Sequence, residues 1–126
     1  MKLLFLAAAG GAFGAAARYL VGIGAARILG YGFPWGTLLV NIVGCLVMGI
    51  FIEFIAQKYS ASIEIRTFIA TGILSGFTTF SAFSLDFVTL IERKQHLAAS
   101  LYFGASISLS VIALFAGLAL VRAALQ

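Results

Sequence analysis

Long runs of apolar residues separated by short polar segments dominate the sequence. Four of these runs, residues 3–26, 37–56, 67–91 and 97–121, are each long enough to cross a bilayer as a helix, which takes about 20 residues. The connecting segments are short and are typical of tight turns between neighbouring helices. We therefore predict an all-α membrane protein with four transmembrane helices, in which residues 1–126 form a single transmembrane domain.

The third run contains a segment that does not suit a lipid-facing helix. Residues 72–84 read GILSGFTTFSAFS, rich in glycine, hydroxyl groups and phenyl rings, near the middle of the run. An interrupted helix leaves backbone groups unpaired in hydrocarbon, which is tolerated only where protein, water or a bound ion satisfies them. Broken helices near the bilayer midplane often hold transported ions. We predict a break in the third helix over residues 75–79.

The composition agrees with a membrane setting and excludes several functions. Hydrophobic residues make up 63% of the chain and charged residues 10%, and the mean hydropathy is +1.14. Cys45 is the single cysteine, and the sequence has neither a Cys/His metal motif nor a phosphate-binding loop, which argues against an enzyme. The net charge of +4 comes from scattered residues and not from a basic stripe, so we expect no nucleic-acid partner.

The distribution of cations across the membrane is nearly even. The side that carries both termini and the middle loop would hold Lys2, Lys58, Arg66 and Arg122, and the opposite side would hold Arg27, Arg93 and Lys94. Because the Lys and Arg asymmetry of short loops sets orientation, such a chain is expected to insert both ways and to form an antiparallel homodimer. The alternative is that Arg18 or the short loops impose one orientation.

Small and polar residues are aligned on the first two helices. Gly10, Gly14, Arg18 and Gly22 recur every four residues, so this face permits close approach of another helix. Arg18 either extends to the bilayer surface or lines a water-filled vestibule. Asn41, in the second helix, either bonds to a neighbouring helix or lines a pore.

Hydroxyl and phenyl groups offer a second set of candidates. Tyr102, Ser106 and Ser110 follow one another at four-residue spacing, in a file about 12 Å long, although serines in helices often bond to their own backbone. Phe80 and Phe83 would share a face if the chain after the break is helical. Their positive ring edges suit a small anion, but both are also typical core residues in a chain with 12 phenylalanines.

Three blocks of the sequence resemble the Fluc fluoride channels, also called the CrcB family. They are GGAFG with RY within residues 10–19, PWGTL with VN and a glycine within residues 34–44, and GFTTFSAFS at residues 76–84. The blocks follow the family pattern in order and spacing and cover nearly the whole chain. The resemblance implies a dual-topology antiparallel homodimer with two pores, passive fluoride conduction and a central structural sodium ion.

The resemblance also implies roles for individual positions. The main-chain carbonyls of Ser75 and Thr78 would hold the sodium ion. The implied fluoride pathway consists of Asn41, Thr79, Phe80, Phe83, Tyr102, Ser106 and Ser110. This chain departs from the pattern at two positions, because Ser75 stands where glycine is common and Ala82 replaces the usual Thr or Ser.

The function implied is selective, passive export of fluoride across a bacterial-type inner membrane, which protects the cell from fluoride toxicity. The membrane potential would drive the anion outward, at about 2.3 kcal/mol per 100 mV. The main alternative is a small dual-topology drug/proton antiporter, but that mechanism needs a carboxylate in the membrane, typically in the first helix, and residues 3–26 have none. A scaffold protein that transports nothing would not explain a break at the midplane.

Overall fold

The computed structural model describes residues 1–58 and 60–125, which form helices joined by short connections. The elements are α1 (Lys2–Leu29), α2 (Trp35–Gln57), α3 (Ile63–Arg66), the π-helix η1 (Thr67–Leu74), α4 (Ser75–Phe77), α5 (Ser81–Glu92) and α6 (His96–Leu125). Because α3 to α5 run end to end, the described residues make four crossings that are long and apolar enough to span a membrane. The predicted all-α, four-span architecture is confirmed.

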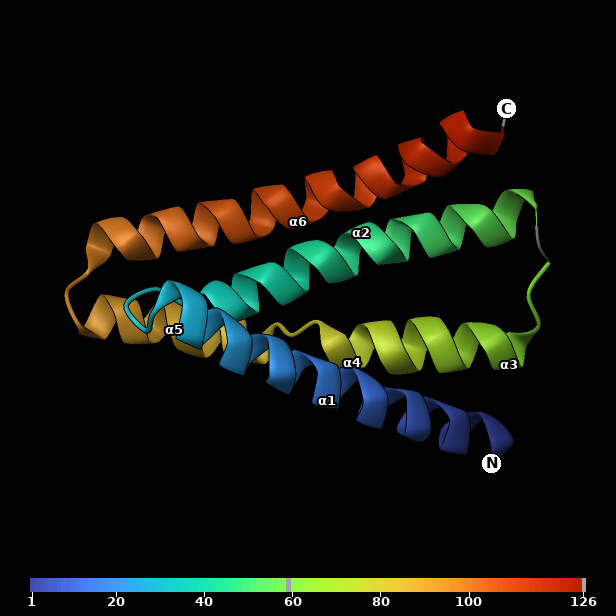
Figure 1. Cartoon of the computed structure of the whole chain (residues 1–126), viewed down its shortest axis with the longest axis horizontal. Helices are drawn as coiled ribbons and strands as arrows, with labels where there is room; N and C mark the ends of the chain where they lie inside the picture. Colours follow the sequence, from blue (N-terminus) through green and yellow to red (C-terminus); the bar gives the residue numbers. More distant parts are fainter. Residues whose placement is uncertain (59, 126) are drawn as a thin grey trace.

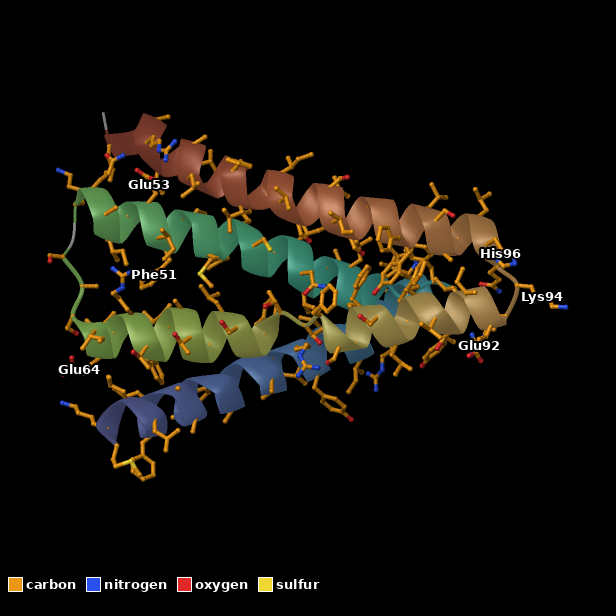
Figure 2. The ribbon with its side chains drawn as sticks, turned by 180° about the vertical axis from the view of Figure 1, so that it is seen from behind. Phe51, Glu53, Glu64, Glu92, Lys94 and His96 are labelled. Carbon is orange, nitrogen blue, oxygen red and sulfur yellow. The ribbon has the colours of Figure 1, made fainter. Side chains whose placement is uncertain are left out.

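The four crossings lie side by side, with α2 next to α6 and the third crossing next to α1 (Figure 1). Both termini lie at one end of the bundle, as an even number of crossings requires (Figure 1). Figure 2 shows Glu53 and Glu64 at this end, and Glu92, Lys94 and His96 at the other. These polar and charged side chains therefore lie toward the bundle ends, where a bilayer would leave them near water.

Glycines bring α1 against the third crossing. A Cβ atom on Gly10 would come within 2.9 Å of the Gly72 Cα, and one on Gly14 within 3.0 Å of the Gly76 carbonyl carbon. Such distances are below van der Waals contact, so only glycine permits this approach. The predicted small-residue face of the first helix thus packs against another helix of the same chain.

The break is shorter and begins later than the sequence predicted. Gly72 and Gly76 lie within helical turns, and the backbone becomes extended only at Thr78, with φ −85° and ψ 161°. The non-helical stretch covers residues 78–80, whereas the prediction was 75–79. The predicted break is present, but its bounds were wrong by three residues at the start, because Gly76 is helical and serves close packing against α1.

The pair α2 and α6 is joined by glycines and by an ion pair. A Cβ atom on Gly49 would lie 3.2 Å from the Gly117 Cα, so the two backbones touch. Nearer the termini, Arg122 Nη2 lies 3.1 Å from Glu53 Oε1, and Gln57 Nε2 donates to Glu53 Oε2 at 2.6 Å. Glu53 is thus a structural carboxylate at the end of the helix pair.

Candidate functional site

The side chain of Asn41 binds the backbone at the break. Its Nδ2 donates to the Thr79 carbonyl at 3.0 Å, and the Thr79 N–H donates to its Oδ1 at 2.8 Å. In a continuous helix the Thr79 N–H would donate to the Ser75 carbonyl. Asn41 on α2 therefore pairs with both backbone groups of one residue and replaces a helical partner.

Thr79 and Arg18 satisfy further groups at the break. The Ala82 N–H, which a continuous helix would give to the Thr78 carbonyl, donates instead to Thr79 Oγ1 at 3.1 Å. Arg18 Nε donates to the Gly76 carbonyl at 3.2 Å. The half-buried Arg18 guanidinium therefore lies at the break and not at the end of its helix.

A groove beside the break brings together six of the seven residues of the implied pathway. The groove has a volume of about 320 Å³, and its lining includes Asn41, Thr79, Phe80, Phe83, Ser106 and Ser110. Three different helices and the break supply these residues. The packing of α2, α5 and α6 brings these residues together although they lie far apart in the sequence.

The two phenyl rings adjoin within this groove. The ring centroids of Phe80 and Phe83 are 5.6 Å apart, with an interplanar angle of 49°. Phe83 is 5% exposed, whereas Phe80 is 77% exposed. One ring is therefore fixed in the core, and the other lies on the surface of the chain.

The hydroxyl groups of Ser106 and Ser110 are available to a ligand. Both oxygen atoms are buried; neither makes a full hydrogen bond with the described residues, and Ser110 has only a weak contact with the Cys45 thiol. They do not bond to the backbone of their own helix, the usual behaviour of serine in membrane helices. Buried hydroxyls without partners are uncommon and call for an explanation such as an ion or water.

Tyr102 lies outside the lining of the groove. Its side chain is fully buried, its ring centroid is 5.2 Å from that of Phe83, and its hydroxyl donates to Asp86 Oδ2 at 3.1 Å. The predicted file of three hydroxyls is thus divided, because the Tyr102 hydroxyl faces α5 while the two serines line the groove.

Two residues near the pathway were missed as site residues. Cys45 lines the groove, and its position four residues after Asn41 was a usable signal, since such residues share a helix face. Asp86 partners Tyr102 from another helix. No sequence pattern links residues 16 apart on different elements.

Thr79 lines a second cavity as well as the groove. This open cavity has a volume of about 400 Å³, and Arg18, Tyr19 and Ala82 are also among its lining residues. The break therefore lies between a space that contains a guanidinium group and a groove that contains hydroxyl and phenyl groups.

Comparison with known proteins identifies the family. Residues 5–118 match the family described as CrcB-like protein, Camphor Resistance (CrcB). The chain belongs to the CrcB family. Relatives named fluoride-specific ion channel FluC include one from Rhizobium etli, 54% identical over 118 residues and 94% of each chain, and one from Rhizobium meliloti, 50% identical over 123 residues and 98% of each chain. A relative of the same name from Chelativorans sp. is 52% identical over 125 residues, 99% of this chain and 100% of the relative.

Membership of the CrcB family confirms the resemblance found in the sequence. The relatives are channels, which are not a class of enzyme, and the four apolar crossings make this CrcB-family chain a multi-pass membrane protein. Among the described residues, no three His, Cys, Asp or Glu side chains come together to hold a metal ion.

Proposed function

We propose that this protein is a fluoride-selective channel that allows passive export of fluoride across the inner (plasma) membrane. The observation that carries this proposal is that the buried hydroxyls of Ser106 and Ser110, which make no full hydrogen bond within the described residues, share one groove with the Phe80 and Phe83 rings. Fluoride must exchange its hydration shell for donors, which hydroxyls and positive ring edges supply. The names of the relatives indicate that the conducted anion is fluoride.

The acids of the chain support an anion path over a cation or proton path. Glu53 is paired with Arg122, and Glu64 with Lys2 at 3.3 Å. Asp86 accepts the Tyr102 hydroxyl and lines a separate open cavity instead of the groove. No carboxylate lines the groove, whereas a drug/proton antiporter needs one to carry its proton.

Fluoride efflux from liposomes containing the purified protein tests the proposed function. With a potassium ionophore present to prevent charge build-up, the protein is expected to release fluoride rapidly and chloride at the background rate of empty liposomes. Equal release of the two anions, or no fluoride release by folded protein, would overturn the proposal. Drug-dependent proton flux would favour the antiporter.

The functional unit of the proposal is an antiparallel homodimer. Phe80 is 77% exposed, and Ile107 and Val111, which line the same open groove, are 46% and 52% exposed. A second copy would cover these apolar side chains and close the groove. The nearly even cation distribution supports opposite insertion of the two copies.

Reporter fusions at the C-terminus are therefore expected to give signals from both sides of the membrane. Adding several lysines beside Lys58 should favour one orientation and lower fluoride efflux, because oppositely oriented partners become scarce. Co-expression with a chain biased the other way should restore the efflux. A single orientation of the unmodified chain together with a cross-linked parallel dimer would contradict the proposal.

The proposal includes a structural sodium ion held by main-chain carbonyls of Ser75 and Thr78 at the dimer centre. The fit is supported by the hydrogen bonds at the break, because the N–H groups of Thr79 and Ala82 donate to side chains instead of to these two carbonyls. Carbonyl oxygens suit an alkali cation. When bound, the positive charge of the ion would compensate the partial negative charges of the carbonyl oxygens. Ser75 in place of glycine is compatible with this role, because its carbonyl is unchanged and its φ is −70°.

A further inference from the structure

Two side chains replace the helical partners of the two carbonyls assigned to sodium. Asn41 Oδ1 accepts the Thr79 N–H at 2.8 Å, and Thr79 Oγ1 accepts the Ala82 N–H at 3.1 Å. In a continuous helix these N–H groups would donate to the carbonyls of Ser75 and Thr78, respectively. Each side chain thus takes up one backbone N–H that would otherwise compete with a cation for one of these carbonyls.

Two other carbonyls at the break, those of Gly76 and Thr79, accept side-chain donors. Arg18 Nε donates to the Gly76 carbonyl at 3.2 Å, and Asn41 Nδ2 donates to the Thr79 carbonyl at 3.0 Å. The Gly76 and Thr79 carbonyls therefore accept a side-chain donor, whereas the Ser75 and Thr78 carbonyls lose their helical donor. Both contacts are partly buried, where hydrogen bonds are electrostatically stronger than in water.

We infer that Asn41 and Thr79 are positioning residues, which keep the Ser75 and Thr78 carbonyls free of backbone donors and so available to a cation. This inference rests on the proposed function, which supplies the sodium ion. It gives both residues a role apart from any contact with fluoride. Because both also line the groove, the anion path and the cation site share these two side chains.

The first test compares variants of Thr79 in purified full-length protein. Thermal unfolding is measured while sodium replaces N-methylglucamine at constant ionic strength, and the sodium concentration for half-maximal stabilisation is determined. Thr79→Val removes the acceptor for the Ala82 N–H, which can then pair with the Thr78 carbonyl if the extended backbone at Thr78 turns back into a helical conformation. The half-maximal concentration is expected to rise roughly tenfold, the equivalent of one hydrogen bond. Thr79→Ser keeps the acceptor and should match the unmodified protein.

Thr71→Val is the matched control, because Thr71 is an exposed residue of η1 in the same crossing. It is expected to leave the half-maximal sodium concentration unchanged. Asn41→Leu tests the other carbonyl, since leucine has a similar volume but cannot accept the Thr79 N–H. A similar, roughly tenfold rise is expected. If Asn41→Leu does not fold, the three threonine variants still decide the question.

Equal half-maximal sodium concentrations in Thr79→Val, Thr79→Ser and the unmodified protein would overturn the inference. Absence of any sodium stabilisation in the unmodified protein would overturn it too. Neither result would touch the proposed fluoride function, which the efflux of fluoride and chloride from liposomes decides separately. Loss of sodium affinity in Thr79→Val with recovery in Thr79→Ser is the result that supports it.

Discussion

Replacing both Phe80 and Phe83 with isoleucine is expected to reduce fluoride efflux by a factor on the order of ten or more, with the protein still folded. Each ring edge contributes about 1 kcal/mol to a favourable electrostatic contact, and isoleucine has no such edge. Isoleucine keeps much of the apolar volume, so Phe83, which is 5% exposed, can be replaced without a large cavity. The measurement is initial fluoride efflux from liposomes, normalised to the amount of folded protein.

Phe77→Ile is the control for the double variant. Phe77 belongs to α4, is absent from the groove lining, and has its ring near Gly44 on α2. This change is expected to lower thermal stability more than it lowers efflux. Unchanged efflux in the Phe80/Phe83 double variant would limit both rings to packing roles and leave the anion path to the hydroxyl and amide groups.

Asn41→Asp is expected to lower fluoride efflux at least as strongly as the double phenylalanine change. The substitution keeps an acceptor for the Thr79 N–H but replaces the Nδ2 donor with an oxygen, so two acceptors would meet across the 3.0 Å now spanned by a hydrogen bond. Leaving such a buried group unsatisfied costs about 1–3 kcal/mol. A negative charge would also repel fluoride in the groove. Together these effects predict a loss of roughly thirtyfold or more.

Gln95→Glu makes the same amide-to-acid change at an exposed position between α5 and α6. Its fluoride efflux should stay close to that of the unmodified protein. If Asn41→Asp conducts fluoride as well as Gln95→Glu does, then the Asn41 amide is needed neither at the break nor in the pathway. Both variants are measured at the same protein density in the same liposomes.

The number and length of the crossings could be predicted from the sequence, because hydrophobic length alone decides whether a helix can span a bilayer. Hydropathy did not locate the break. Gly72 and Gly76 are the obvious helix breakers in the third run, yet both are helical and face Gly10 and Gly14 on α1. A glycine in a membrane helix has two uses, flexibility and close packing, and only the neighbouring helix distinguishes them.

The candidate residues themselves were also accessible from the sequence, but their contacts were not. Asn41 could be placed on a helix face, whereas its pairing with both backbone groups of Thr79 depends on α2 lying against the break. Tyr102, Ser106 and Ser110 share a helical spacing, yet only the serines line the groove. The Tyr102 hydroxyl instead donates to Asp86, because a buried phenol needs a hydrogen-bond partner and the adjacent helix α5 provides the acceptor.

By itself the sequence determined the membrane setting, the four crossings and the family, since apolar length, block order and spacing are properties of the chain alone. The tertiary structure decided where the third crossing breaks and which carbonyls lose their helical partners. The physical reason is that each backbone N–H at the break has one hydrogen to donate. Whether it donates to a carbonyl or to the side chain of Asn41 or Thr79 depends on how separate helices pack.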